Sequence, residues 1–582
     1  MTDFRRTLLW VVFSMSLVLI WDAWQRHNGQ PSMFGPAPAK PAAAGASAVP
    51  SDVPRAALPA SAAGNASTAG GIPAAPVTKQ VTISTDLVKA TLDSTGGSLV
   101  RLELLKQADQ NDRTKKVMLF DQTAKRLYAA QSGLVPLAGG IALPNHHTAM
   151  YLVPGDLELK EGSNELQVRF ESPEVGGVKL AKVYTFRRGD YVIGVRHEVV
   201  NNSSAAISPR LYLQLVRDGH PPEGESSFYM TFTGPAIYTE ASKFQKVDFK
   251  TIEKHKAGDK PDHATSGDSG WVAMVQHYFA SAWLPDNGSG AKLPREFYTD
   301  KADVLNPATG SNAHIYSVGM TLPVGEVAAG STKAFDAQLY AGPQEENKLA
   351  ALAPGLELVK DYGWFTILAK PLFWLLTQLH GLLGNWGWAI VALVVLLKIA
   401  FYWLNASAYR SMAKMKAINP KVMELRERLK DKPQQMQQEM MRIYREEKVN
   451  PLGGCLPIFA QMPFFIALYW VLLSSVEMRN SGWLYIADLA RPDALFGAIP
   501  FIDMPIGPLP LLMTASSLLQ TWLNPTPPDP VQAKMMWIMP LVFSVMFFFF
   551  PAGLVLYWLT NNILSIAQQY LINKQLGVLG KG

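Results

Sequence analysis

Residues 387–404 form an apolar run in which aliphatic and aromatic side chains surround a single charged residue, Lys398. A run of this length predicts a membrane-spanning helix, because about 20 residues of helix cross the hydrocarbon layer of a bilayer. A lysine inside such a helix costs roughly 3 kcal/mol on insertion scales, so it requires a polar partner or water. Either Lys398 faces a cavity within the protein, or its long side chain reaches the headgroups. Its position well inside the run favours the cavity.

A first apolar run covers residues 8–20 and follows Arg5 and Arg6. The residues directly after it, beginning with Trp21, are bulky or charged, whereas cleavage of a signal peptide requires small residues there. We therefore expect an uncleaved transmembrane anchor over residues 1–24. The two arginines predict that its N-terminus stays in the cytoplasm.

The chain after this anchor consists mainly of Ala, Pro, Ser and Gly. Such a segment has too few large apolar side chains to form a core, so residues 25–79 are predicted to be a flexible linker.

Residues 80–345 change to short runs in which apolar and polar side chains alternate, with Gly, Pro and Asn between the runs. In residues 100–104, for example, Val and Leu alternate with Arg and Glu. Alternation of this kind is typical of strands with one buried face, and its repetition predicts an all-β sandwich. Because the domain lies between the anchor and the next membrane run, we expect it to lie outside the cytoplasm.

Residues 346–384 are predicted to be a connector followed by an amphipathic helix. Apolar residues recur there at spacings of three and four, namely Phe365, Leu368, Leu372, Leu375, Leu379 and Leu382. If this helix spanned the membrane, the basic loop after residue 404 would lie outside, against the positive-inside rule. We therefore interpret it as an interfacial helix lying flat on the outer surface.

Residues 405–450 carry eleven Lys and Arg against six Asp and Glu. Helical spacing of apolar residues, broken at Pro433, predicts a two-helix cytoplasmic hairpin. One interpretation is a solvated hairpin that fixes the topology. The other is a docking surface for the ribosome or targeting machinery, since RNA and anionic lipids attract basic side chains. The candidate docking residues are Arg410, Lys414, Lys416, Arg426 and Arg428.

Four further apolar runs are predicted to span the membrane, at residues 455–473, 508–523, 535–550 and 554–572. With the anchor and the run containing Lys398, this makes six transmembrane helices, with both termini cytoplasmic. The helical core would cover residues 385–575 and be followed by a short tail, 576–582. Some runs are short for a bilayer, and short spans thin the membrane around them.

Polar residues recur along one face of the last run, at Trp558, Asn561 or Asn562, Ser565 and Gln569. One interpretation is ordinary hydrogen bonding between helices. The other is that this face converges with Gln461 and Lys398 on a water-containing groove inside the membrane. The spacing leaves both interpretations open.

The composition argues against chemical catalysis. Cys455 is the only cysteine, which excludes an internal disulfide and a multi-cysteine metal site. The sequence has no phosphate-binding glycine loop in a strand–loop–helix context, no glycine-framed nucleophilic serine and no histidine pair with metal spacing. We expect no enzyme activity, no cofactor, no metal and no specific DNA binding. The histidines His146, His147, His263 and His277 are interpreted as surface or core residues.

Several long segments resemble the YidC/Oxa membrane-protein insertases. In the helical part these segments are residues 384–398, 409–421, 448–472 and 550–562. Residues 270–285 resemble the large periplasmic domain of the Gram-negative members. The resemblance covers most of the chain except the linker.

This resemblance implies a five-helix insertase core around a hydrophilic groove, open to the cytoplasm and to lipid, besides the N-terminal anchor. The positive residue of that groove is usually arginine in the family, and Lys398 stands at the matching position. Lysine keeps the charge but lacks the bidentate fork of arginine. The resemblance also implies an inner-membrane protein whose periplasmic domain is a β-supersandwich similar to sugar mutarotases.

The implied partners are nascent membrane proteins, the Sec translocon with its accessory subunits, translating ribosomes with the targeting machinery, and membrane lipids. Two rival functions remain at this stage. A secondary transporter would use Lys398 as an ion or proton relay, although transporters usually show internal repeats, and we find none here. A membrane-anchored periplasmic carbohydrate-active enzyme would require paired carboxylates in a cleft.

Overall fold

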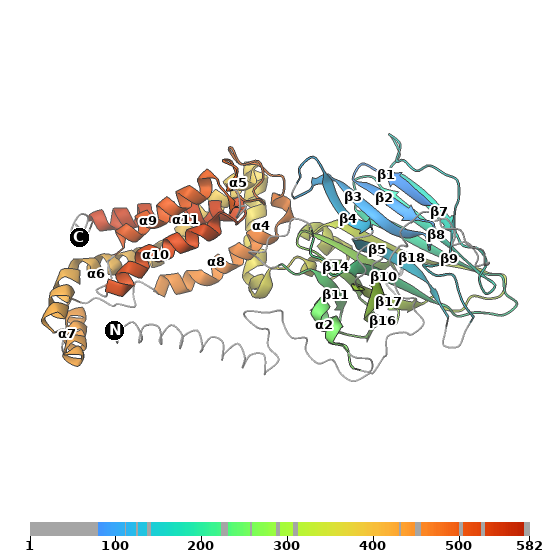
Figure 1. Ribbon diagram of the computed structural model, residues 1–582, viewed down its shortest axis with the longest axis horizontal. Helices are drawn as coiled ribbons and strands as arrows, with labels where there is room; N and C mark the ends of the chain where they lie inside the picture. Colours follow the sequence, from blue (N-terminus) through green and yellow to red (C-terminus); the bar gives the residue numbers. More distant parts are fainter. Residues whose placement is uncertain are drawn as a thin grey trace. The chain divides into compact units, whose positions relative to one another are not determined.

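The computed structural model describes residues 79–110, 112–123, 126–136, 141–222, 231–255, 259–286, 292–305, 312–429, 432–447, 456–499, 504–524 and 530–575. Contacts among them divide the chain into two compact units, residues 79–360 and residues 361–575 (Figure 1). We call these the β unit and the helical unit. The predicted N-terminal anchor, the linker apart from Lys79, and the tail lie outside the described residues.

The β unit contains two nine-stranded antiparallel sheets. The first sheet has the order β1 (Gln80–Ser84), β2 (Val88–Asp93), β3 (Ser98–Ala108), β4 (Lys116–Gln122), β5 (Leu127–Val135), β10 (Arg210–Asp218), β17 (Asn312–Pro323), β16 (Arg295–Leu305), β13 (Ser266–Gly267). The second has the order β12 (Lys243–Lys246), β11 (Gly234–Thr239), β14 (Trp271–Val275), β15 (Phe279–Asp286), β18 (Thr332–Pro343), β9 (Val192–Asn201), β8 (Val178–Arg187), β7 (Glu165–Glu171), β6 (Tyr151–Leu152). Short helices α2 (Phe249–Lys254), α3 (Glu346–Leu352) and η1 (Leu356–Val359) accompany them.

Side chains from the two sheets meet in one core. Trp283 on β15 donates its indole N–H to the Gln214 carbonyl on β10 at 3.0 Å. The alternation seen in the sequence has the expected cause: Val100, Leu102 and Leu104 on β3 are buried, whereas Arg101 between them is exposed. The prediction of an all-β sandwich is confirmed.

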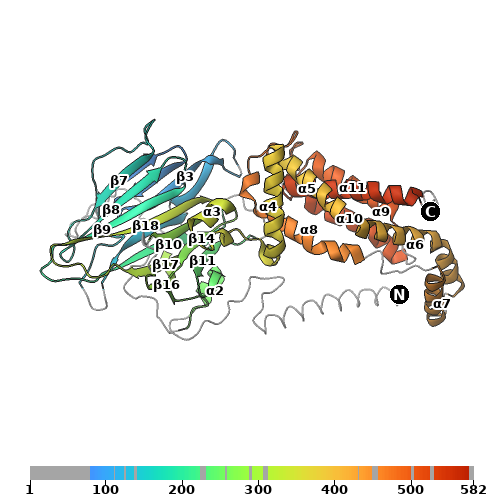
Figure 2. The same ribbon diagram turned by 180° about the vertical axis from the view of Figure 1, so that it is seen from behind.

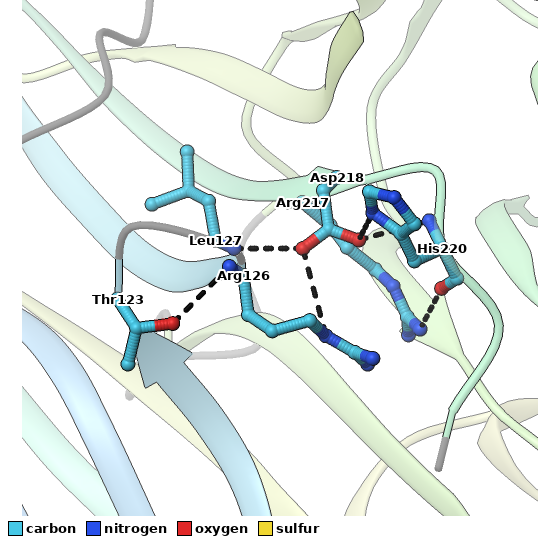
Figure 3. Close-up of polar contacts among 6 residues, drawn as sticks. All are labelled: Thr123, Arg126, Leu127, Arg217, Asp218 and His220. Carbon is cyan, nitrogen blue, oxygen red and sulfur yellow. Dashed lines mark hydrogen bonds and ion pairs between the residues drawn. The ribbon is translucent and has the colours of Figure 1, made fainter. Parts of the chain in front are cut away.

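A buried carboxylate joins the end of β10 to the start of β5 (Figure 3). Asp218 accepts hydrogen bonds from the backbone N–H groups of Leu127 at 2.7 Å and His220 at 2.8 Å. Arg126 approaches the same carboxylate at 3.8 Å, and Arg217 donates to the His220 carbonyl at 2.9 Å. Because a buried carboxylate must be hydrogen-bonded to be tolerated, these contacts fix the junction.

Two of the four scattered histidines, His146 and His263, are buried in the core of the β unit, and His147 is exposed. Lys182 is also fully buried in this core. Lys182 donates to the carbonyls of Gly96 at 2.6 Å and Ser132 at 2.8 Å.

The helical unit begins with a short 3₁₀ turn, η2 (Gly363–Phe365). Its helices are α4 (Thr366–Leu383), α5 (Trp386–Ala400), α6 (Tyr402–Arg428), α7 (Pro433–Glu446), α8 (Leu456–Ser474), α9 (Pro508–Leu523), α10 (Pro530–Phe547) and α11 (Ala552–Gln575). The loop between α8 and α9 contains a 3₁₀ turn, η3 (Val476–Met478), and a small hairpin of β19 (Ala498–Ile499) and β20 (Met504–Pro505). Helix α11 packs against α5, α6, α8 and α9, and α4 packs against α5 and α8. The prediction of a helical C-terminal part is confirmed.

Helix α4 crosses the ends of the other long helices instead of running alongside them (Figures 1 and 2). Its predicted apolar face is buried in part and exposed in part. The buried residues are Ala369, Leu372, Phe373 and Leu376, whereas Leu382 is 82% exposed. The helix ends at Gly384, whose φ of 68° is the left-handed conformation of a helix C-cap.

The prediction of one continuous helix over residues 387–404 is wrong. Helix α5 ends at Ala400, α6 begins at Tyr402, and their axes are bent by 70°. Phe401 between them has φ −93° and ψ 11°, and its ring packs edge-to-face on Phe464 at 5.0 Å. This tertiary contact accompanies the break, which has no glycine or proline.

Among the described helices, none is by itself both long and apolar enough to cross a bilayer, and α5 with α6 reaches that length and hydropathy only as a bent pair. The boundaries of the later apolar runs nevertheless match helices closely. The run 508–523 coincides with α9, and 554–572 lies within α11.

The two helices predicted for residues 405–450 are present as α6 and α7. Pro433 is the first residue of α7, a position that proline favours because its missing N–H has no helical partner there. An ion pair of 2.6 Å between Lys421 and Glu447 links the two helices.

Candidate functional site

Lys398 lies in the last turn of α5 and points at α11. Its ammonium donates a hydrogen bond of 2.6 Å to the hydroxyl of Ser565, and this buried hydroxyl donates at 2.7 Å to the carbonyl of Asn561 one turn earlier. The lysine side chain is half-buried. The structure thus brings two of the predicted site residues, Lys398 and Ser565, together, and Asn561 takes part through its backbone carbonyl.

No carboxylate among the described residues lies within ion-pairing distance of Lys398; its hydrogen-bond partner is neutral. A positive charge without an acidic partner attracts negative charge strongly where water is scarce, since the Coulomb energy rises as the effective dielectric falls. The site can therefore bind an acidic group brought by another molecule.

Gln461 on α8 makes a second polar contact, with α6 instead of α5. Its side-chain amide donates to the Asn405 carbonyl oxygen at 2.6 Å. The Asn405 amide nitrogen is buried and has no hydrogen-bond partner among the described residues. A buried donor of this kind is commonly satisfied by water. Asn405 was not among the predicted residues, although it immediately follows the apolar run and could have been noted for that reason.

The remaining predicted residues of α11 make other contacts. Asn562 donates to the hydroxyls of Ser516 at 3.3 Å and Ser517 at 3.2 Å on α9. Trp558 is buried and stacks on Phe465 with ring centroids 5.5 Å apart. The predicted residues therefore do not form one continuous cluster.

Gln569, one turn beyond Ser565, is a further polar residue of α11. It donates to Asn524 at the end of α9 at 3.0 Å, and its own carbonyl oxygen is buried with no partner among the residues described. Helix α11 thus carries polar side chains toward both α5 and α9.

The five candidate docking residues all lie on α6. Arg410, Lys414 and Arg428 are exposed, and Lys416 and Arg426 are half-buried. They therefore place positive charge along the surface of the hairpin.

The β unit contains a Ser–His–Lys group that resembles catalytic machinery by composition. The Ser132 hydroxyl lies 2.8 Å from the His197 ring, and burial lowers the pKa of Lys182 to about 7 and that of His197 to about 3. All three side chains are buried, and Lys182 and His197 are entirely inaccessible to solvent. A substrate could not reach them, so the group belongs to the core.

No group of three or more metal-ligating side chains lies together in the described parts of the chain.

Two family models match the chain. The model described as the YidC periplasmic domain matches residues 80–375, and the model described as the 60Kd inner membrane protein matches residues 378–578.

Relatives match over the full length. The membrane protein insertase YidC of Janthinobacterium sp. (strain Marseille) is 53% identical, over 99% of this chain and 100% of its own. That of Cupriavidus necator is 54% identical, over 99% and 98%.

Among solved structures, an active YidC insertase crystal structure with the first transmembrane domain resolved matches 84% of this chain and 92% of its own, with 19% identity and a TM-score of 0.37. A putative aldose 1-epimerase from Escherichia coli K12 matches 46% of this chain and 99% of its own, with 9% identity and a TM-score of 0.27.

Proposed function

Because the chain belongs to the YidC family of membrane protein insertases, we propose that it inserts and helps to fold inner-membrane proteins by guiding the nascent helix past the ammonium of Lys398. The observation that carries this proposal is the hydrogen bond of Lys398 to Ser565, which holds the ammonium on α11 without an acidic partner.

In this scheme the helical unit lies in the inner membrane. Residues 80–345 form the periplasmic domain, 346–384 the connector and interfacial helix, and 385–575 the insertase core. The crossing orientation of α4 supports its place flat on the outer surface (Figure 1). Six transmembrane helices with cytoplasmic termini remain part of the proposal, and so does the cytoplasmic position of the α6–α7 hairpin.

The barrier to insertion is the transfer of polar or acidic residues of the substrate through hydrocarbon. Burying an unpaired charge is costly, and a fixed positive charge beside the path offsets part of that cost. The apolar substrate helix then moves into lipid, where its apolar surface is removed from water.

Two features support a substrate path across the membrane that contains water and is shorter than a full bilayer. The buried amide nitrogen of Asn405 and the carbonyl oxygen of Gln569 lack partners among the described residues, and water would satisfy both. Helix α9 has 16 residues, which span about 24 Å against the roughly 30 Å of a typical hydrocarbon layer. A thinned bilayer leaves less hydrocarbon for the substrate to cross.

The proposed partners are nascent membrane proteins, the Sec translocon, and the ribosome with its targeting machinery. The exposed basic residues of α6 support contact with RNA or anionic lipid, through charge attraction that salt would weaken.

The test is insertion into proteoliposomes of two substrates that differ only in acidic or neutral residues of the translocated segment. Lys398→Glu and Lys398→Ala should slow insertion of the acidic substrate on the order of tenfold, about 1.4 kcal/mol of barrier, and Lys398→Arg should retain it. Lys534→Glu, at an exposed lysine of α10, is the matched control for the change in total charge. Full insertion of the acidic substrate by Lys398→Glu would remove this charge from the mechanism.

A further inference from the structure

The loop between α8 and α9 presents large apolar side chains outward from a rigid frame. Leu484 is 72% exposed and Phe496 is 65% exposed, and their neighbours Tyr485 and Leu495 are exposed as well. We call these four residues the loop patch. They come in two adjacent pairs at the tips of two tight turns.

The first turn holds its pair outward at a conformational cost. Trp483 and Ile486 exchange two backbone hydrogen bonds of 2.8 Å, so Leu484 and Tyr485 are the central residues of a two-residue turn. Leu484 has a φ of 51°, a left-handed conformation that costs a non-glycine residue about 1–2 kcal/mol. Glycine is the usual residue at a left-handed first central position of such a turn. A leucine there points to a function for its side chain.

A buried carboxylate connects the two turns. Asp493 accepts from the Tyr485 hydroxyl at 2.8 Å and from the backbone N–H of Leu509 at 2.9 Å. In the second turn, Phe496 donates its N–H to the Ile506 carbonyl at 2.9 Å. The patch is therefore fixed to the start of α9 and is not a loose loop tip.

The loop is also fixed to the beginnings of two other helices. The N–H groups of Ala552 and Gly553 at the start of α11 donate to carbonyls of Arg491 and Leu489 at 2.7 and 2.8 Å. At α5, Asn385 donates to the Gly482 carbonyl at 2.9 Å. The loop thus lies at the end of the helical unit where α5, α9 and α11 begin.

The patch continues onto exposed apolar side chains of these helices. Trp388 in the first turn of α5 is exposed and packs edge-to-face on Trp483, next to Leu484, at 5.5 Å. On the other side, Leu511 and Leu512 in the first turn of α9 are exposed. In the proposed membrane orientation, exposed apolar side chains such as these would contact lipid.

We propose that the loop patch inserts into the outer leaflet of the inner membrane, at the depth of the headgroups, as an interfacial anchor separate from α4. Leu and Phe supply apolar area, and Tyr beside Trp is typical of the membrane–water interface. An apolar surface continuous with lipid-facing helices is covered by the same lipid, which removes it from water. The inference rests on the proposed membrane orientation and not on insertion activity.

The test uses the full-length chain in a Cys455→Ser background, reconstituted in nanodiscs of phosphatidylethanolamine and phosphatidylglycerol. Leu484→Cys and Phe496→Cys each carry an environment-sensitive fluorophore. Asn480→Cys, exposed on the same loop, is the control, and Val542→Cys, exposed on α10, is the reference for lipid. The unfolding temperature of each labelled variant must first be shown to equal that of the unlabelled Cys455→Ser protein.

We expect lipids spin-labelled near the headgroup to reduce fluorescence at positions 484 and 496, and lipids spin-labelled deep in the acyl chain to reduce it at 542. Iodide in the water should reduce it at 480 alone. If positions 484 and 496 respond to iodide as 480 does, the patch faces water and the proposal is wrong. If they are protected from both quenchers, a protein surface covers them, and the lipid proposal is equally wrong. Loss of lipid quenching at 542 itself would instead overturn the membrane orientation on which the proposed function depends.

Discussion

Lys398 and Ser565 are separated by 167 positions in the sequence, yet the lysine ammonium donates to the serine hydroxyl at 2.6 Å. The contact joins the end of α5 to the middle of α11. It determines where the positive charge lies and leaves it without an acidic neighbour among the described residues.

Replacing Ser565 by aspartate should block the site from within. The new carboxylate would pair with Lys398 and compete with acidic residues of the substrate, so insertion of acidic segments should fall as strongly as in Lys398→Glu. Ser565→Asn, similar in size but neutral, is the control and should remain active. Insertion rates of the acidic and neutral substrates measure the effect. Unchanged insertion of the acidic substrate by Ser565→Asp would contradict the proposed role of the charge.

The contact between Gln461 and Asn405 should contribute to stability through satisfied buried polar groups. Asn405→Leu leaves the Gln461 amide without its acceptor, which should lower the free energy of unfolding by about 1–3 kcal/mol. Gln461→Leu alone should cost a similar amount. The double variant should be less destabilised than the sum of the two, because no polar group is left unpaired. Unfolding of the full chain in detergent gives all three values, and strict additivity would show that the two side chains act independently.

Asp218 should be important for the stability of the β unit. In Asp218→Ala, the N–H groups of Leu127 and His220 lose their acceptor, and we expect a loss of about 1–3 kcal/mol. Asp156→Ala is the matched control, because that carboxylate is exposed and its ion pair with Lys160 lies at the surface. Hydrogen exchange of β5 and β10 in the full chain would detect the loss, and equal protection in both variants would exclude the proposed junction.

Lys182 should make the stability of the β unit depend on pH. Burial lowers its pKa from the ordinary value of 10.5 to about 7 in the folded protein, so between these values the unfolded chain binds more protons. Stability should therefore rise with pH across this window, by roughly 1 kcal/mol per pH unit. Below pH 7 both states are protonated and the contribution is constant.

The comparison with Lys182→Met isolates this group. Its buried neighbour His197 has a pKa of about 3 and does not titrate in this window. Tyr184, whose pKa is raised by burial, is present in both proteins, so its contribution cancels in the comparison. The methionine variant should lack the extra slope between pH 7 and 10.5 in chemical unfolding. The same slope in both proteins would mean that Lys182 remains charged in the folded state.

Local sequence patterns predicted the elements whose cause is local. Alternation in residues 100–104 follows the two faces of β3, and the apolar run 508–523 has the bounds of α9. The buried and exposed sides of α4 were harder to predict. Ala369 is buried and Leu382 is exposed because of which neighbouring helices pack against each part of α4. Spacing shows that a helix has an apolar face but not which part of that face finds a neighbour.

The sequence could predict only that the polar residues of the site meet at α11, and not which of them contact one another. The sequence placed Lys398, Asn561 and Ser565 in one group; the structure joins Lys398 to Ser565, and Asn561 takes part through its backbone carbonyl. It also placed Gln461 and Trp558 there, but one contacts Asn405 and the other an aromatic cluster. Partners separated by 56 or 167 positions depend on helix packing, which periodicity does not encode.

The break at Phe401 couples the two ends of the α5–α6 pair. Lys398 precedes this corner and Asn405 follows it, so the backbone angles of Phe401 set the direction of one polar residue relative to the other. Helix α6 continues from this corner to Arg428, whereas Lys398 lies in the last turn of α5, directly before it. A change in the backbone angles of Phe401 would therefore swing the far end of α6, with its basic residues, relative to Lys398.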